Sequence, residues 1–300
     1  MIQNITVTNY LGESLKMDLD NPRESGFLIR SIDGLGAPKA TINTTDLSNM
    51  DGNVFNSARA ESRNIVFDIV FWGPNIESLR QKSYRYFPVK KPLTLTFETD
   101  NRTSQAVGYV ESNEPDIFSS EESTQISIIC PYAFVSALNF QKTVISGLEA
   151  LFEFPFSNES LTEPLLVFSN LWKRYSAYVV YKGDADTGAI ITLSAIGDAK
   201  NITIANLDTR EQIKIDTDKM AQLTGKGFQL SDSIIISTVP GDISAQLLRD
   251  GDYYNILNCV DRASQWFLLT KGNNHIGYVA EEGTTNIRMY VENKVWYEGV

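Results

Sequence analysis

A strand–helix–strand block at residues 64–100 constrains the fold more than any other stretch of the sequence. In residues 65–71, apolar side chains recur at every second position, which is the period of a β-strand with one buried face. Gly73-Pro74-Asn75 then ends the strand, and Asn75 is of a residue type that caps helices. Apolar side chains recur at helical spacing from Ile76 to Tyr86, and residues 93–97 alternate again. The block therefore predicts one short helix held between two strands.

Outside this block the sequence has the pattern of an all-β chain, in which short alternating segments are separated by turn residues. In the first half we expect a hairpin at residues 1–17 and strands at 27–32, 107–110 and 125–130. In the second half we expect strands at 165–168, 177–181, 189–195, 201–205, 212–216, 233–237, 255–257, 265–269, 286–291 and 294–297. Strands at this spacing are typical of a β-sandwich.

Two long polar segments interrupt the first half. Residues 31–53 are rich in Gly, Asp, Asn and Thr, and they read as a long loop or arm. A loop of that length inside a compact domain is uncommon and tends to be functional. Residues 111–124 form a second polar and acidic loop. The character of the sequence changes near residues 135–145, so we expect two domains, 1–138 and 139–300.

The charge and the cysteine content limit the partners and the compartment. A net charge of -11, with a pI near 4.7, argues against direct binding to nucleic acid or to an anionic membrane. An acidic surface usually serves solubility, and the alternative is a surface along which DNA slides without sticking. Cys130 and Cys259 are far apart and are expected to stay reduced. Without a signal peptide or a long apolar run, the chain is expected to be soluble, cytoplasmic when made, and without a membrane anchor.

No motif in the sequence supplies catalytic, cofactor or metal chemistry. His275 is the only histidine, and it lies in an expected turn. The stretch Asp184–Gly188 resembles the start of a calcium loop, but its glycine comes one position early and the twelfth position is Ala195. Gly34-Leu35-Gly36 lacks the third glycine and the strand–helix context of a dinucleotide site. We therefore predict no catalytic residue, no cofactor and no metal, and a wall-degrading hydrolase would need an acid pair that the sequence does not indicate.

Several stretches of the sequence resemble the siphophage distal tail protein family, the hub of the tail tip. They are Ile32–Gly36, Asp51-Gly52 with Arg59 and Arg63, the 64–100 block with its Pro88–Leu93 connection, Thr124–Pro131, Tyr181–Asp184 with Gly188, Gly272–Asn274, Tyr290 and Trp296–Val300. The resemblance covers nearly the whole chain and is strongest over residues 26–132.

The resemblance implies a structural virion protein without enzymatic activity. Its N-terminal domain would be a tail-tube-like β-barrel or sandwich with one flanking helix, assembling into a hexameric ring. Its C-terminal domain would be a galectin-like β-sandwich that supports receptor-binding or other baseplate proteins. The ring would continue the tail tube toward the tail-tip protein below, and DNA would pass through its lumen without specific binding. A tail-tube protein is the nearest rival, and the long second domain argues against it.

Three basic residues on the expected helix, Arg80, Lys82 and Arg85, are candidate inter-subunit contacts in so acidic a protein. The alternative for them is an ordinary solvated face. We also hypothesise that the 31–53 arm and the 111–124 loop reach neighbouring subunits or the lumen. The alternative function is a carbohydrate-binding host-recognition module, since aromatic side chains such as those of Trp266 and Trp296 stack on sugar rings. Aromatic residues at strand spacing are more often part of a core or an interface.

Overall fold

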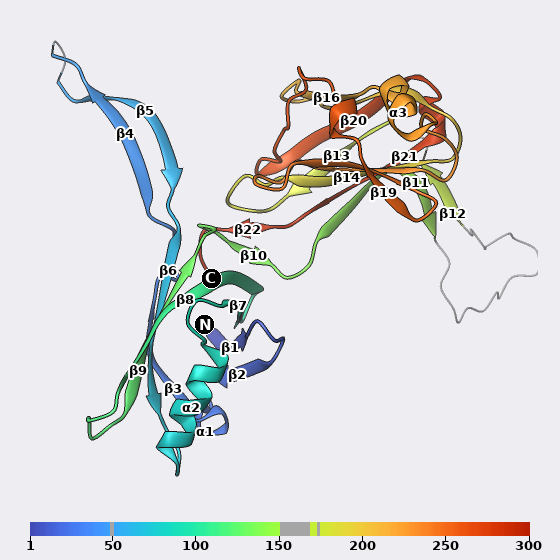
Figure 1. The fold of residues 1–300 in the computed structure, drawn as a ribbon. Helices are drawn as coiled ribbons and strands as arrows, with labels where there is room; N and C mark the ends of the chain where they lie inside the picture. The colour runs from blue at the N-terminus through green and yellow to red at the C-terminus, as the bar shows by residue number, and fades with distance from the viewer. Residues whose placement is uncertain (49–50, 151–168, 173–174) are drawn as a thin grey trace, which may run out of the picture. The chain divides into compact units, whose positions relative to one another are not determined.

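The computed structural model describes residues 1–48, 51–150, 169–172 and 175–300 (Figure 1). These residues form two compact units: unit 1 comprises Met1–Leu138 and Trp296–Val300, and unit 2 comprises Asn139–Val295. Both units consist of antiparallel β-sheets with a few short helices, so the expected all-β class is confirmed. No helix within the described ranges is long and apolar enough to cross a membrane.

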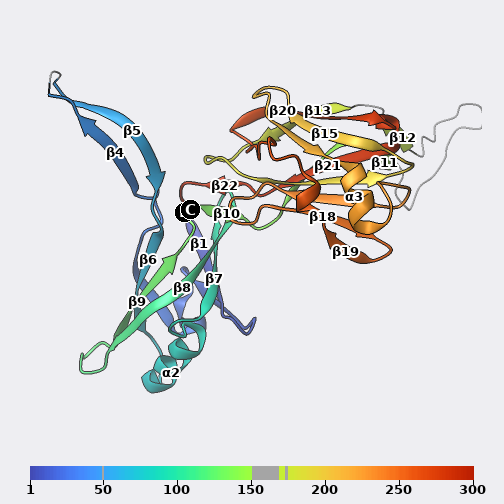
Figure 2. The same cartoon turned by 45° about the horizontal axis from the view of Figure 1, so that its top comes forward.

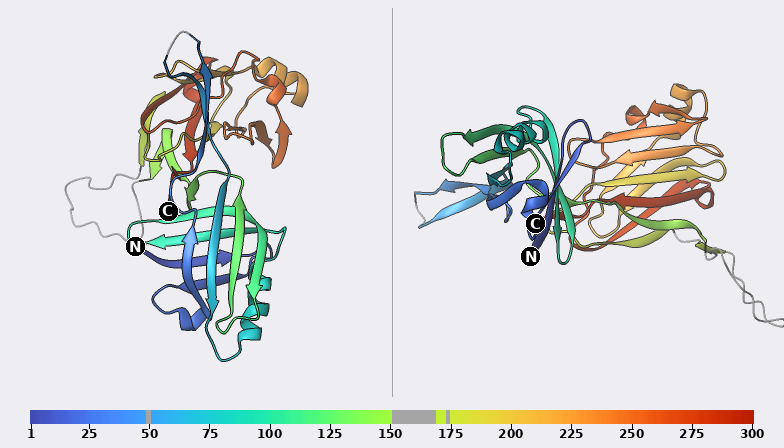
Figure 3. Two further views of the ribbon diagram at one scale, coloured as in Figure 1. Left: turned by 90° about the vertical axis from the view of Figure 1, so that its left-hand side faces the viewer. Right: turned by 90° about the horizontal axis from the view of Figure 1, so that it is seen from below.

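A nine-stranded sheet forms the body of unit 1, and the left view of Figure 3 shows its strands side by side. Its main path is β2-β1-β7-β8-β9-β6-β3, and β10 pairs with both β8 and β22. The strands are β1 Ile2–Thr8, β2 Ser14–Asp18, β3 Phe27–Asp33, β6 Arg63–Phe71, β7 Pro92–Thr99, β8 Thr103–Asp116, β9 Ser123–Cys130, β10 Val135–Ala137 and β22 Trp296–Tyr297. Among the described strands, β2 and β3 end this path without pairing with each other, so the sheet is open and does not close into a barrel.

The core of unit 1 lies on one face of this sheet. Ile65, Phe67 and Ile69 of β6 are fully buried, as their alternation predicts. Helix α2 (Ile76–Tyr86) packs Ile76, Leu79 and Tyr86 against this core. The Asn75 side chain caps the helix by accepting a hydrogen bond of 3.0 Å from the Ser78 backbone N–H. The predicted strand–helix–strand block is therefore present. The short helix α1 (Pro22–Ser25) precedes β3.

Unit 2 is a sandwich of two sheets (Figure 2). The larger has the order β12-β11-β21-β14-β17-β18-β19, and the smaller has the order β13-β20-β15-β16. The strands are β11 Gln141–Ala150, β12 Ser169–Trp172, β13 Ser176–Tyr181, β14 Ala189–Ala195, β15 Lys200–Asn206, β16 Gln212–Ile215, β17 Ser233–Ser237, β18 Ser244–Arg249, β19 Asp252–Asn255, β20 Gly272–Glu282 and β21 Ile287–Asn293. A buried hydrogen bond of 2.7 Å joins Ser146 of β11 to the Tyr278 hydroxyl of β20, so the sheets face each other.

Unit 2 differs from the sequence prediction at several elements. Helix α3 (Thr217–Thr224) was not expected; Asp216 caps it, and Gly225 ends it with a left-handed backbone. The turn expected at Gly272–Asn274 is instead the start of β20, which places His275 within a strand. Among the described residues, 265–269 form no strand of their own. The strand expected at 165–168 lies outside the described residues.

The last five residues of the sequence belong to unit 1, although we expected them in the second domain. The physical reason is that β22 pairs with β10, with Tyr297 beside Val135 and Trp296 beside Ser136. Beyond β22, Arg102 donates a hydrogen bond of 2.8 Å to the Gly299 carbonyl oxygen. The segment is therefore held by backbone pairing and by an arginine of the turn between β7 and β8.

Candidate assembly surfaces

A two-stranded hairpin, the arm, projects from the nine-stranded sheet between β3 and β6 (Figure 1). It consists of β4 (Ala40–Asp46) and β5 (Asn53–Ala60), and it pairs with no other described strand. Every residue of β5 is exposed, as is nearly all of β4. The sequence predicted a loop or arm at 31–53; in the structure the arm is a β-strand ribbon whose first strand, β4, lies within these bounds and whose second strand, β5, begins at their end.

The register of the arm gives its two faces different chemistry. Ile42 lies beside Ala58, and Phe55 lies beside Thr44 on the same face, because opposed and alternate residues of a ribbon share a face. Ile42 is 61% exposed and Phe55 63% exposed. The opposite face is mainly polar: it includes the pair of Asn43 and Ser57, and its apolar residue is Val54, beside Thr45. A lone two-stranded ribbon is marginally stable in water, so its apolar face is suited to contact with another chain.

A buried arginine holds the base of the arm. Arg63 is 4% exposed, and it donates hydrogen bonds to four carbonyl oxygens, those of Gly34, Gly36, Ala133 and Glu298. Burial lowers the pKa of its guanidinium below the ordinary value. The side chain thus ties together the start of the arm, the segment before β10 and the segment after β22.

The three predicted contact residues of α2 all have partners within unit 1. Arg80 forms an ion pair of 3.0 Å with Glu122, and Lys82 donates a hydrogen bond of 2.9 Å to the Ser25 carbonyl oxygen. The exposed Arg85 side chain binds both carboxylate oxygens of Glu13. That contact, together with a hydrogen bond from Asn9, lowers the pKa of Glu13 to about 2. A role for Arg80, Lys82 and Arg85 between subunits stays a prediction.

The polar segment 111–124 is the end of a long hairpin rather than a loop. Strand β8 continues to Asp116 and β9 begins at Ser123, so only residues 117–122 connect them. Phe118 in this connection is 97% exposed, and Ile117 is about half-exposed. Sequence reasoning missed this apolar tip because polar residues surround it.

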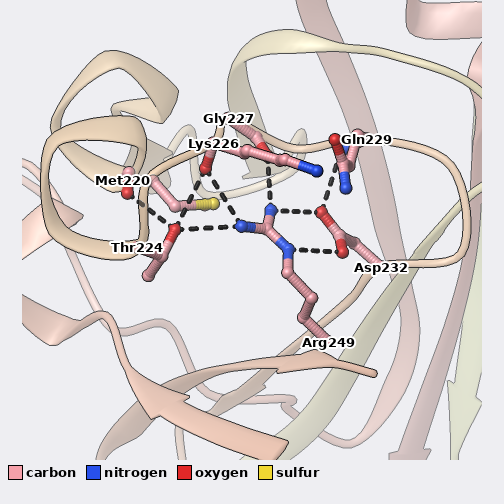
Figure 4. Close-up of polar contacts among 7 residues, drawn as sticks. All are labelled: Met220, Thr224, Lys226, Gly227, Gln229, Asp232 and Arg249. Carbon is pink, nitrogen blue, oxygen red and sulfur yellow. Dashed lines mark hydrogen bonds and ion pairs between the residues drawn. The ribbon is translucent and has the colours of Figure 1, made fainter. Parts of the chain in front are cut away.

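Unit 2 contains a buried ion pair between Arg249 of β18 and Asp232 (Figure 4). The side chains are 8% and 2% exposed, and the Arg249 Nε–H donates to an Asp232 carboxylate oxygen at 2.8 Å. The guanidinium also donates to Thr224 Oγ1 and to the carbonyl oxygens of Lys226 and Gly227. Asp232 raises the pKa of Arg249, since it stabilises the charged form. The network fastens the segment after α3 onto β18.

His275 lies on the smaller sheet of unit 2. Its ring stacks on Tyr178 with centroids 4.5 Å apart, and its Nε2 is 3.0 Å from Ser176 Oγ. A hollow of about 250 Å³ lies on the same sheet, with Tyr175, Ser176 and Gly277 in its lining and no charged residue. Neither Trp266 nor Trp296 is among the residues that line this hollow.

Two further observations concern metal-ligating side chains and the cysteine thiols of the described residues. Among them, no group of three or more His, Cys, Asp or Glu side chains is arranged to hold a metal ion. Cys130 and Cys259 are both free and buried. Burial raises the pKa of the Cys130 thiol to about 11, which keeps it protonated at neutral pH.

Comparison with known proteins gives a match in sequence and matches in fold. Residues 182–294 match the family described as siphovirus-type tail component, C-terminal domain. No curated protein matches the chain. The crystal structure of SPP1 Dit (gp 19.1), described as a paradigm of the hub adsorption apparatus in phages infecting Gram-positive bacteria, superposes with a TM-score of 0.67 at 12% identity, over 97% of this chain and 98% of that chain.

Two structures of the phage P2 baseplate in its activated conformation are also similar. The structure with Ca has a TM-score of 0.50 at 14% identity over 100% of both chains, and that with Sr has 0.50 at 13% over 99% of both. At these identities the superpositions establish the fold, and the sequence match covers residues 182–294 within unit 2. The resemblance of this chain to the siphophage distal tail protein family, predicted from its sequence, is thereby confirmed.

Proposed function

We propose that the protein is a structural component of a siphophage tail tip, in which copies of unit 1 form a hexameric ring between the tail tube and the tail-tip protein below. Unit 2 docks receptor-binding or other peripheral baseplate proteins. The observation that carries this proposal is the agreement in fold with the SPP1 Dit hub protein over 97% of this chain. A likeness confined to one domain would support a shared module only.

The arm and the sheet edges support assembly into a closed ring. The arm leaves the apolar side chains of Ile42 and Phe55 more than half exposed. Strands β2 and β3 are open edges of the nine-stranded sheet, and closure into a ring is one way to cover such edges. The net charge of -11 suits a lumen through which DNA passes without specific binding.

The proposal assigns no catalytic activity, cofactor, metal or membrane anchor to the protein. The chain is made in the host bacterial cytoplasm and ends in the virion tail tip. Its partners are copies of itself, the tail-tube protein, the tail-tip protein and the proteins that dock on unit 2.

Negative-stain microscopy of the purified chain tests the proposal. We expect six-fold rings with a central hole. A variant with Ile42→Asp and Phe55→Asp is expected to keep its circular dichroism and to lose the rings, because both side chains are exposed within the subunit. A strict monomer at high protein concentration would contradict the ring.

Carbohydrate binding is the second candidate function. The observation that favours it is the Tyr178–His275 stack on the same sheet as an uncharged hollow. Titration of the full chain with neutral methyl glycosides, followed by NMR, tests it with Tyr178→Ala as the control. Binding that disappears in Tyr178→Ala would favour recognition of host glycans, and no shift at millimolar sugar would leave docking as the role of unit 2.

A further inference from the structure

An exposed surface that combines aromatic, aliphatic and basic side chains lies where the β1–β2 turn meets the segment after α2. We call it the basic patch, and it consists of Tyr10, Leu11, Val89, Lys90 and Lys91. The first three side chains are 50%, 64% and 47% exposed. The Lys91 ammonium lies 5.3 Å from the centre of the Tyr10 ring, which holds the two segments together.

The two lysines of the basic patch have no carboxylate partner among the described residues. The Lys90 backbone is left-handed (φ 66), and its N–H donates a hydrogen bond of 2.9 Å to the Val110 carbonyl oxygen, so the segment is fixed on β8. Among the residues that the structure describes, neither Lys90 nor Lys91 forms a salt bridge. They differ in this from Arg80 and Arg85, which have carboxylate partners.

The end of the β8–β9 hairpin has the opposite charge. We call it the acidic tip, and it consists of Glu114, Asp116, Ile117 and Phe118. The sequence contains no lysine or arginine between residues 103 and 141. Phe118 is 97% exposed, and within the described part of the chain neither Glu114 nor Asp116 is in a salt bridge.

Two carboxylates on the β9 side of the hairpin connection are already in ion pairs. Glu121 pairs with Arg30 at 2.8 Å, and Glu122 pairs with Arg80 at 3.0 Å. These ion pairs hold the base of the tip against unit 1, whereas the carboxylates of Glu114 and Asp116 at its outer end stay available for a partner. The acidic tip therefore presents the protruding side chain of Phe118 beside the carboxylates of Glu114 and Asp116, neither of which is in an ion pair with a described residue.

The tip and the patch lie on opposite sides of unit 1. Figures 1 and 2 both show the green β8–β9 hairpin end on one side and the dark-blue β1–β2 turn on the other. A cyclic ring of more than two copies needs two different, complementary surfaces on each subunit, because each contact is head-to-tail. This placement and the opposite charges meet that need.

We propose that the acidic tip of one copy docks on the basic patch of the next copy around the ring. Phe118 packs against Tyr10 and Leu11, and the carboxylates of Glu114 and Asp116 face the two patch lysines. The inference rests on the proposed ring and names the subunit contact within it. A protruding aromatic anchor supplies affinity at an interface centre, and the paired charges set orientation and association rate. A stable interface buries about 1,600 Å², so the arm must add to this contact.

Charge reversal and its rescue test the contact. One variant carries Glu114→Lys and Asp116→Lys, a second carries Lys90→Glu and Lys91→Glu, and a third carries all four changes. We expect each of the first two to raise the protein concentration for half-assembly by about tenfold or more, measured by mass photometry, and the third to restore assembly. The control carries Asp242→Lys and Asp252→Lys, which replace two exposed acids of unit 2. It changes the net charge by the same amount as the first variant and is expected to assemble normally. Unchanged melting temperatures verify folding.

A second variant separates packing from charge. Phe118→Ala is expected to weaken assembly at all salt concentrations, whereas the charge reversals lose their effect in high salt. Rings of normal stability in the first two variants, or no rescue in the third, would overturn this contact and leave the proposed ring standing. A wild-type chain that forms no ring would instead overturn the proposed function, and this contact with it.

Discussion

The buried ion pair of unit 2 gives the sharpest test of the energetics. We consider Asp232→Asn, which keeps the size of the side chain and removes its charge. In the wild-type chain this carboxylate accepts two hydrogen bonds from Arg249 and one of 2.9 Å from the Gln229 backbone N–H. In asparagine an NH2 group replaces one of the two carboxylate oxygens. An N–H of Arg249 then faces this NH2 group, and neither can accept a hydrogen bond from the other.

The size of the effect follows from the burial of the pair. Removing one partner of a buried ion pair costs about 3–5 kcal/mol, because the remaining charge is left without compensation. Arg249 keeps its hydrogen bonds to the carbonyl oxygens of Lys226 and Gly227, which still stabilise the cation. We therefore expect Asp232→Asn to lower the free energy of unfolding by about 3 kcal/mol, the lower end of this range. This is roughly a hundredfold change in the unfolding equilibrium constant.

The assay must separate the two units, because a two-domain chain need not unfold in one step. We expect hydrogen exchange in increasing urea, read by mass spectrometry, to show β17 and β18 opening at lower urea while β6 and β9 of unit 1 are unchanged. The control is Asp218→Asn, whose partner Lys200 is 3.7 Å away and whose pair is largely exposed. An exposed pair of this kind contributes about 0–1 kcal/mol.

A loss below about 1 kcal/mol for Asp232→Asn, equal to that of the exposed control, would refute the reasoning. It would mean that water or a shift of the segment after α3 compensates Arg249 as well as the carboxylate does.

Three further predictions concern unit 1. Arg85→Gln is expected to raise the pKa of Glu13 from about 2 toward its ordinary 4.5, measured by NMR titration. Because the folded pKa is depressed, the contribution of this pair is present above pH 4.5 and is lost as the pH falls toward 2. Cys130, with its pKa near 11, is expected to resist iodoacetamide at pH 8 until urea unfolds the chain. Gly34→Ala is expected to destabilise unit 1 by about 2 kcal/mol or more, since Gly34 has φ +84 and a Cβ there would lie 1.9 Å from the Asn64 carbonyl oxygen.

Each of these has an outcome that would contradict it. The first prediction would be wrong if the pKa of Glu13 stayed near 2 in the Arg85→Gln variant. Rapid alkylation of Cys130 in the folded chain would show that its burial is incomplete. The control for Gly34→Ala is Gly36→Ala, where a Cβ meets no atom within 4 Å, and equal stabilities of the two variants would contradict the steric argument.

The sequence predicts the elements whose signals are local. The 64–100 block is correct because Asn75, the helical spacing and the flanking alternation all act within a few residues of one another. Strands β14 and β17 also have the expected bounds, since each is a compact apolar run between turn residues. Local patterns of this kind are sufficient where tertiary contacts agree with them.

Other elements depend on tertiary contacts that no local pattern reports. Asn274 looks like a turn residue, yet its side chain is buried and bonds to the Thr270 backbone, which lets β20 begin among glycine and asparagine. Glu298 reaches unit 1 because Arg63 binds its carbonyl oxygen, a contact between residues 235 positions apart. Backbone carbonyls have no sequence signature, so this placement could not be predicted.

The candidate assembly surfaces were predicted in part. The composition of 31–53 indicates an exposed arm, but the apolar face joins Ile42 to Phe55 across the hairpin through a register that includes a bulge. Phe118 stands among polar residues, and its exposure follows from the length of β8 and β9. Arg80, Lys82 and Arg85 could be placed on the helix, whereas their partners Glu122, Ser25 and Glu13 come from distant segments.

The pairing of β10 with β22 makes unit 2 an insertion in the chain of unit 1. The chain leaves unit 1 after Leu138 and returns at Trp296, through two strands that lie next to each other. A sequence inserted between neighbouring antiparallel strands can change in length or be exchanged for another domain without altering the register of the host sheet. If the proposed function holds, recombination at these two points would give a phage new peripheral attachments while the part of the protein proposed to form the ring is inherited intact.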